Sequence, residues 1–248
     1  LYDTYGFPVD LTADILRSKN IKVNKKEFNE SLEKQKSKAR QNWSGTGSKA
    51  TDKIWFDILS NTTPTDFLGY EEESGAAIIQ SIVVKDKIVN TISVNDEAVL
   101  ILNQTTFYGE SGGQIGDTGI ISTDDCIFEV TDTKKKLGLH LHYGKVKKGN
   151  MKNGDSVTLE INISKRNSLR SYHTATHLLH QSLRDTLGDH VTQKGSLVSH
   201  DRLRFDFSHH KQISKEEVDK IESIVDNKIA QNYPVWTQSM KPEDAIKM

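Results

Sequence analysis

The sequence predicts an α+β protein of 248 residues in three parts. Apolar residues recur at helical spacing near both ends of the chain, whereas in the middle they alternate with a period of two. The expected parts are an N-terminal helical segment, a small β-barrel, and an α/β core in which a long helix packs on an antiparallel sheet. Their expected boundaries are residues 1–53, 54–163 and 164–248, the last part being truncated at its C-terminus.

The first part is expected to be helical up to about residue 43. Pro8 suits the first turn of one helix, and Asn24 can cap a second helix that carries Phe28 on its apolar face. The outer face of the second helix is basic, so it can contact a phosphate backbone or be an ordinary solvated surface. Residues 44–53, SGTGSKATDK, are polar and contain glycine, which predicts a flexible linker.

The middle part contains seven short runs of β-type residues separated by turn signals such as Asn153-Gly154-Asp155. This number of runs at this spacing favours a small barrel or a sandwich. The expected strands are residues 77–84, 87–94, 97–102, 119–122, 126–133, 139–146 and 156–161.

A glycine-rich segment, FYGESGGQIGDTG at residues 107–119, interrupts these strands. A nucleotide-phosphate loop would need a strand before it, a helix after it and a G-x-G-x-x-G or G-x-x-x-x-G-K-[ST] spacing. A strand follows instead and neither spacing occurs, which excludes an ATP or dinucleotide site here. The glycines predict a turn that lets another segment or a ligand approach the backbone, or else a plain structural turn.

The third part begins with a predicted helix that carries a histidine pair. Ser164 can cap its start and Gly188 suits its end. His173 and His177 stand four residues apart on one helix face, which is the spacing of a metal-binding pair. The segment lacks the glutamate of an H-E-x-x-H motif, so a metallopeptidase is disfavoured, and surface histidines that bind no metal are the alternative.

The remainder of the third part is predicted to supply a sheet and another helix. Residues 203–207, LRFDF, alternate apolar and polar side chains, and residues 192–196, TQKGS, are expected to lead into the same sheet. Ser214 and Glu217 form a capping box for a helix that ends before Pro234.

Composition limits the classes of function. The net charge of -1 and the sequence pI of about 6.8 argue against a nonspecific nucleic-acid coat, although a local basic face remains open. No apolar run approaches the length of about 18 residues that a membrane span requires, and no secretion signal is present. The single cysteine, Cys126, excludes an internal disulfide and fits a reducing, cytoplasmic location. Because the chain opens at Leu1 without a methionine, we expect a piece of a longer protein.

Three segments, in this order, resemble alanyl-tRNA synthetases. They are LYDTYGFPVDLT at residues 1–12, the glycine-rich segment, and HTATHLLHQSLRDTLGDHVTQKGSLV at residues 173–198 followed by LRFDFSH at residues 203–209. The resemblance implies that residues 1–43 end the helical tRNA-recognition region, that about 72–163 form a barrel related to those of translation factors, and that 164–248 form most of an editing core. The aminoacylation domain, which uses ATP and magnesium, would lie upstream.

On this resemblance the chain is part of an alanine-tRNA ligase and carries the region that hydrolyses mischarged seryl- or glycyl-tRNA(Ala). Such a region is needed because a pocket for alanine cannot strongly reject glycine or serine. The implied partners are tRNA(Ala) and the aminoacyl groups alanine, serine and glycine, with no membrane. The alternatives are a free-standing trans-editing deacylase and a tRNA-binding module without activity.

The resemblance also implies a zinc centre held by an H-x-x-x-H pair and a downstream C-x-x-x-H pair. His173 and His177 match the first pair, but no cysteine follows Cys126, so the second pair has no match. Two of four ligands leave a tetrahedral zinc ion incompletely held, and we expect weak or absent zinc binding by this chain.

The resemblance and the chemistry of discrimination suggest further site residues. A group that binds the serine hydroxyl would be left unpaired by alanine, and Gln193, Thr174 and Thr176 are the candidates for it, with loop support as the alternative for Gln193. Contacts to substrate and tRNA are expected from Gly112, Gly113, Gln114, Lys194 and Arg204, with Tyr108, Glu110, Ser111, Arg170 and Arg202 as further polar candidates. The remaining histidines of this part are expected to be surface or capping residues: His180, His190, His200, His209 and His210.

Overall fold

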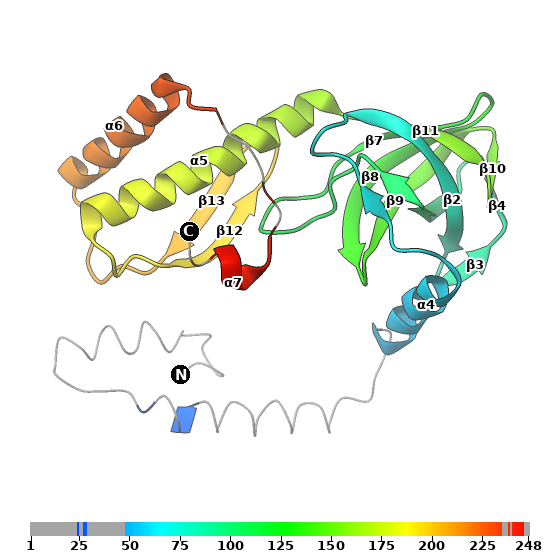
Figure 1. Ribbon diagram of the computed structural model, residues 1–248, viewed down its shortest axis with the longest axis horizontal. Helices are drawn as coiled ribbons and strands as arrows, with labels where there is room; N and C mark the ends of the chain where they lie inside the picture. Colours follow the sequence, from blue (N-terminus) through cyan, green and yellow to red (C-terminus); the bar gives the residue numbers. More distant parts are fainter. Residues whose placement is uncertain (1–23, 25–26, 29–47, 235–237, 239, 246–248) are drawn as a thin grey trace.

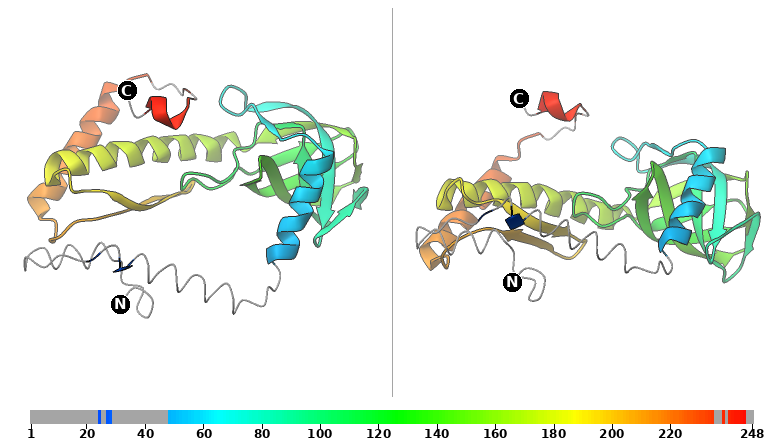
Figure 2. Two further views of the ribbon diagram at one scale, coloured as in Figure 1. Left: turned by 60° about the horizontal axis from the view of Figure 1, so that its bottom comes forward. Right: turned by 90° about the horizontal axis from the view of Figure 1, so that it is seen from below.

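The computed structural model describes residues 24, 27–28, 48–234, 238 and 240–245. A β-barrel forms one end of the molecule and a layer of helices on a small sheet forms the other (Figure 1). Helix α5 (Ile163–Leu187) starts at the barrel and runs along the second layer, as the two further views in Figure 2 also show. The expected α+β class is thereby confirmed.

Most of the helical segment expected at residues 1–43 lies outside the described residues. At Asn24, which is described, the side-chain Oδ1 accepts a hydrogen bond from the Glu27 amide at 3.3 Å. The Phe28 amide donates to the Asn24 carbonyl at 3.1 Å. This is the arrangement of a helix N-cap and agrees with the role expected for Asn24.

Six antiparallel strands close into the barrel, which decides between the barrel and the sandwich that the sequence left open. Around the ring the order is β11, β7, β8, β9, β5 and β2, and the pairing of β2 with β11 closes it. The strands are β2 (Ser74–Val84), β5 (Glu97–Leu102), β7 (Gly119–Ser122), β8 (Ile127–Lys136), β9 (Leu139–Lys148) and β11 (Ser156–Ile161).

Shorter strands extend this ring. They are β1 (Asp66–Phe67) paired with β6 (Gln104–Thr105), β3 (Lys87–Val89) paired with β2, and β4 (Thr91–Ser93) paired with β10 (Asn150–Lys152). Strand β8 is longer than expected, because Leu137 and Gly138 adopt positive φ angles of 52° and 79°. The tight turn that results lets β8 and β9 pair up to Lys136 and Leu139.

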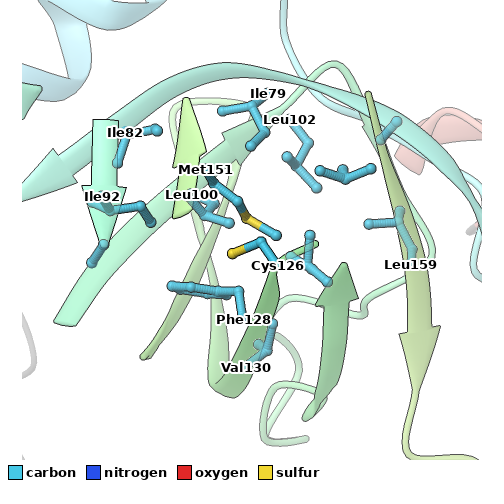
Figure 3. Close-up of a cluster of buried hydrophobic side chains, with 14 of the residues drawn as sticks. Ile79, Ile82, Ile92, Leu100, Leu102, Cys126, Phe128, Val130, Met151 and Leu159 are labelled. Atoms are coloured by element: carbon cyan, nitrogen blue, oxygen red, sulfur yellow. The ribbon is translucent and has the colours of Figure 1, made fainter. Parts of the chain in front are cut away.

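The inward-facing residues of the barrel form its apolar core (Figure 3). In β11 the burial alternates, with Val157, Leu159 and Ile161 inside and their neighbours outside. The single cysteine, Cys126, is fully buried in the same cluster, near Met151 and Phe128. It therefore serves as a small apolar residue of the core.

Helix α4 (Ser48–Asn61) corrects two expectations. Residues 48–53 begin this helix, although the sequence predicted a flexible linker there, and the region from Ile54 onward continues it instead of starting a strand pattern. Ile54, Trp55 and Ile58 are buried against the outside of the barrel. Their spacing places them on one helix face, and this burial outweighs the poor helix propensity of the polar start.

In the second layer, α5 packs on the antiparallel pair β12 (Gln193–Val198) and β13 (Leu203–Phe207) and on α6 (Lys215–Gln231). The expected strand at 203–207 and the pairing of the TQKGS segment with it are confirmed. The fully buried apolar residues of this layer's described cluster are Leu183, Val191 and Ile221. A short helix, α7 (Pro242–Ala245), follows near the end of the chain.

The helix ends agree only partly with the prediction. Asn162, not Ser164, caps α5, because its Oδ1 accepts a hydrogen bond from the Lys165 amide at 3.0 Å and the helix already begins at Ile163. Gly188 ends α5 as expected, with a positive φ of 112°. The capping box of Ser214 and Glu217 at the start of α6 is confirmed. Within the described part of the chain, no helix has the length and apolarity needed to cross a membrane.

Candidate functional site

A buried ion pair fixes the start of α5 to the barrel. Arg166, in the first turns of the helix, donates from Nε to Asp117 Oδ2 at 2.8 Å, and each residue's side chain is at most 4% exposed. The guanidinium also donates to the carbonyls of Gly69 at 2.8 Å and Thr106 at 2.7 Å, and Asp117 Oδ2 accepts from the Tyr108 amide at 2.7 Å. We call Gly69, Thr106, Asp117 and Arg166 the junction. Its charges are fully hydrogen-bonded, which is what a buried pair requires.

The glycine-rich segment leaves the barrel and lies against the end of β12. The Val198 amide donates to the Gly113 carbonyl at 2.7 Å, and the Ile115 amide donates to the Val198 carbonyl at 3.1 Å. Gly113 has a φ of +82°, and a Cβ on it would lie 2.6 Å from the Ser196 carbonyl oxygen. The prediction of a turn that lets another segment come close is confirmed, and the approaching segment is β12.

The histidine pair lies directly beside this contact. His173 and His177 project from the same face of α5, with ring centroids 5.1 Å apart and rings inclined by 22°. His173 Nδ1 lies 2.7 Å from Oε1 of Gln114, a side chain of the glycine-rich segment that is 6% exposed. Because a carbonyl oxygen only accepts, Nδ1 carries the proton and donates it, and Nε2 keeps its lone pair.

The surroundings keep His173 in its neutral form. Burial is the main cause that lowers the pKa of His173, and the nearby His177 lowers it further. A neutral imidazole with one nitrogen held by a hydrogen bond and the other free is the form that binds a metal ion. The residues present thus fit two ligands of a zinc ion. Among the residues that the structure describes, the only cluster of three or more potential ligands lies elsewhere and does not include this pair.

The two threonines proposed for the serine hydroxyl are in different environments. Thr174 is exposed on α5 next to His173. Thr176 is 5% exposed, and its hydroxyl donates to the Tyr172 carbonyl at 2.8 Å within the helix. The structure therefore places Thr174 where a solvent-borne ligand can reach it, whereas the proton of Thr176 is already used.

Gln193 and Lys194 begin β12, at the end remote from the glycine-rich segment. Both are exposed, and Gln193 pairs in register with Phe207. Val198 is five positions after Gln193 in the strand, which is roughly 15 Å at ordinary strand spacing. The structure thus does not bring Gln193 to the point where Gln114 meets His173.

The basic candidates are mostly paired with carboxylates. Arg204 is exposed and donates from Nε to Asp206 at 2.9 Å, and this hydrogen bond and charge raise the pKa of Arg204. Arg170 donates to Glu73 of the barrel side at 2.6 Å. Arg202 is exposed in the turn between β12 and β13. Arg204 and Arg170 therefore form ion pairs in this structure, with Asp206 and Glu73.

The other residues of the glycine-rich segment divide into exposed and engaged ones. Gly112 has a φ of +60° with open space around it, and Ser111 is exposed. Tyr108 donates from its hydroxyl to the Ser111 carbonyl at 3.2 Å. Glu110 lies 3.9 Å from Lys134 of β8. Gly112 and Ser111 are consequently the parts of the loop most open to a ligand.

A cavity of about 420 Å³ is lined by the glycine-rich segment together with residues of the barrel and of α5. Its lining includes Asp132, Lys165, Leu169 and His200 but neither residue of the histidine pair. Sequence reasoning missed both this space and the junction. The signal for the junction was an arginine three residues before Leu169, on the buried side of a helix, where a guanidinium needs a carboxylate partner.

Comparison with known proteins gives one family. A family model described as tRNA synthetases class II (A) matches residues 1–165. Alanine--tRNA ligases from Mesorhizobium japonicum and Parvibaculum lavamentivorans are 49% and 51% identical over 247 and 248 residues, or 99% of this chain. The corresponding ligase of a Chelativorans species is 48% identical over 247 residues. The chain spans 28% of the length of each of these relatives.

Proposed function

The chain belongs to the alanine-specific class II tRNA synthetases, and we propose that α5, the β12–β13 pair and the glycine-rich segment form a region that hydrolyses seryl- or glycyl-tRNA(Ala). The observation that carries the proposal is the contact of Gln114 with His173 at 2.7 Å. This contact joins a barrel loop to a histidine pair of metal-binding spacing. Surface histidines without a function would not need such a hydrogen-bond partner.

His173 and His177 would hold the zinc ion of this region. When bound, the ion would supply a Lewis acid that activates water or holds the amino group of the substrate. Gln114 acts through His173: it keeps the proton on Nδ1 and the ring in one orientation. It is therefore a positioning residue in this proposal.

Selection of serine over alanine would come from a polar group near the pair. Thr174 is exposed and next in sequence to His173, so its hydroxyl is available for a substrate hydroxyl. Gln193 remains part of the proposal, and it would need to act from the far end of β12. Thr176 would contribute only as an acceptor, because its hydroxyl proton is bonded to Tyr172.

The partners in this proposal are tRNA(Ala) and its serine, glycine and alanine esters. Gly112, Gly113 and Lys194 are proposed contacts to the RNA. Arg204 is a weaker candidate for such a contact, because it already pairs with Asp206. ATP and magnesium would serve aminoacylation, which we do not assign to these residues. A cytoplasmic location belongs to the same proposal.

The test is deacylation of seryl-tRNA(Ala) and alanyl-tRNA(Ala) by the chain supplied with zinc, and by a full-length alanine-tRNA ligase that contains it. We expect His173→Ala to slow seryl ester hydrolysis in the full-length enzyme at least ~100-fold, and Gln114→Ala by about 10-fold to 100-fold. Lys147→Ala, which removes an exposed ion pair with Glu129 on the barrel, is the surface control and should change the rate less than about twofold.

Unchanged hydrolysis in His173→Ala would overturn the proposed site. Binding of tRNA without hydrolysis of either ester, in the full-length enzyme as well, would favour the binding-module alternative. If Gln114→Ala lowers the rate and the zinc affinity together, its positioning role is supported. If it lowers neither, Gln114 is only a packing residue of the loop.

A further inference from the structure

Three histidines from two segments meet at the end of the second layer that is remote from the barrel. His190 lies in the connection between α5 and β12, and His209 and His210 directly follow β13. The two segments are joined below these rings, because the Ser208 amide donates to the Thr192 carbonyl at 3.0 Å and the Ser208 hydroxyl lies 2.8 Å from that of Thr192. The three imidazoles are thus held together by the backbone that carries them.

The distances between these rings suit a shared ion. The potential ligand atoms all lie within 4.8 Å of one another, and the ring centroids are 5.0 to 5.1 Å apart. Nitrogens that share a tetrahedral zinc ion at about 2.0–2.1 Å lie roughly 3.3 Å apart, so small ring rotations bring the three into place. No change of backbone is needed for shifts of this size.

The closest contact of the cluster brings two ring nitrogens together. His190 Nε2 and His209 Nδ1 face each other at 2.9 Å, so one of them must carry a proton for the other to accept. A metal ion at this place would take the position of that single proton and use both lone pairs. His209 Nε2, on the other side of the ring, is buried without a hydrogen-bond partner among the described residues.

We propose that His190, His209 and His210 form a binding site for a divalent transition-metal ion, such as zinc. Imidazole nitrogens suit Zn²⁺, Ni²⁺ and Cu²⁺, and three of them leave a fourth position for water or another ligand. His190 and His210 are exposed, so an ion can enter, and the partly buried His209 forms the floor of the site. The ion would tie the end of α5 to the end of β13.

The surroundings of His209 favour its neutral form. Burial is the main cause that lowers the pKa of His209, followed by the nearby His210 and His190 and by Lys211. Glu217 of α6 acts in the opposite direction on that pKa. The charge of Lys211 is partly offset, because its Nζ donates to Glu217 Oε1 at 3.0 Å. A neutral His209 can therefore act as a ligand at physiological pH.

This cluster is separate from the histidine pair of the proposed editing region. Leu187, at the end of α5, is ten positions after His177, a distance of about 15 Å along the helix axis. One ion cannot serve both places. The sequence predicted weak or absent zinc binding by the whole chain, on the ground that only His173 and His177 match a zinc centre. A zinc ion bound at the three-histidine cluster would overturn that prediction, and variants of the two places can be tested apart.

The test is calorimetric titration of the chain with zinc chloride. The background variant is His173→Ala with His177→Ala, which removes the editing pair and leaves the cluster intact. We expect this variant to bind one zinc ion per chain, and the further exchange His190→Gln or His210→Gln to weaken binding on the order of 100-fold or more. His200→Gln is the matched control, since it removes another exposed histidine of the same layer and should leave the affinity unchanged.

Thermal unfolding supplies a second readout. Zinc should raise the melting temperature of the background variant, and the rise should vanish in His190→Gln, because only an ion bound to the folded state stabilises it. Absence of zinc binding in the background variant would overturn the proposal. So would unchanged affinity in both His190→Gln and His210→Gln, which replace exposed residues and are expected to fold.

Discussion

The half of α5 nearest the barrel is held by buried polar contacts, whereas the far half rests on a small apolar cluster. In the near half Arg166 is buried in the junction, and His173 is bonded to Gln114. In the far half, Leu183 is buried with Val191 and Ile221, and Leu179 and Leu187 are only partly covered. Along the same helix the contacts thus change from hydrogen bonds and an ion pair, which are directional, to apolar packing, which is not.

This difference indicates which part of the helix suits a site that needs side chains in fixed orientations. Directional bonds fix the orientation of a side chain, while an apolar cluster of this size allows small shifts. His173 and His177 lie at the end of the fixed half, next to the contact of the glycine-rich segment with β12. The proposed editing pair is accordingly on the part of α5 that directional bonds hold, and the three-histidine cluster lies beyond the part held by apolar contacts.

The largest expected effect comes from breaking the junction. Arg166→Ala leaves the Asp117 carboxylate buried without its partner, and we expect a loss of about 3–5 kcal/mol in the free energy of unfolding. Arg170→Ala is the matched control, because this exposed arginine is one turn away, pairs with Glu73, and should cost at most about 1 kcal/mol. Urea unfolding measures both changes.

Amide hydrogen exchange in the same variant tests the comparison directly. If the two halves are held independently, exchange in Arg166→Ala should rise more in residues 163–173 than in residues 179–187. An equal rise in both parts would show that α5 unfolds as one unit, and would contradict the view that its two halves are held independently.

The second effect is acid sensitivity of the barrel. His142 is fully buried, and its Nδ1 donates to the Leu100 carbonyl at 3.0 Å, while Nε2 faces Thr105 Oγ1 at 2.8 Å. Burial lowers the pKa of His142 to about 4 and that of His140 to about 3. Both rings are therefore neutral in the folded state, and stability is lost as the pH falls from about 6.5, where the unfolded chain begins to bind protons, toward these values.

Between pH 7 and pH 5.5 the two histidines together should cost about 2–3 kcal/mol in the free energy of unfolding. The slope against pH should largely disappear in the double variant His140→Gln with His142→Gln, whatever its stability at pH 7. His200→Gln, which changes an exposed ring, should keep the slope. A slope that persists in the double variant would place the acid sensitivity outside the barrel core.

The third effect, similar in size to the second, concerns the contact of the glycine-rich segment with β12. Gly113→Ala combines a positive φ with a carbonyl 2.6 Å from the new Cβ, so we expect a loss of about 2–3 kcal/mol in the free energy of unfolding. Gly112→Ala has the positive φ alone and should cost about 1–2 kcal/mol. The difference in the free energy of unfolding between the two variants measures the contact with Ser196. Equal losses would show that β12 shifts away from the added Cβ at little cost.

Local signals made much of the fold predictable. Residues 97–102, 119–122 and 156–161 are strands within the bounds expected, because alternation and turn residues mark both ends of each. Gly188 and the Ser214 capping box were recognisable for the same reason. The start of α4 was missed because burial against distant residues decides it. The cap at Asn162 was missed because Ser164, two residues later, is also a good capping residue.

The candidate site was only partly predictable. The helix period placed His173 and His177 on one face, but nothing local links them to Gln114, which is 59 positions earlier. The junction joins residues 49 positions apart, and the three-histidine cluster joins residues 19 positions apart. Such contacts depend on how the glycine-rich segment and the β12–β13 pair are placed against α5. The periodicity of the sequence contains no information about that placement.

The junction also constrains the order in which the chain can fold. Every group that satisfies Arg166, namely the Gly69 and Thr106 carbonyls and the Asp117 carboxylate, precedes it in the sequence. During synthesis from the N-terminus these acceptors leave the ribosome before Arg166 does, and so do all strands of the ring, the last of which ends at Ile161. Docking of α5 would then follow barrel closure, because a guanidinium cannot enter the interior before its acceptors are assembled. On this order of events, the closed barrel determines where α5 docks and thereby where His173 and His177 lie.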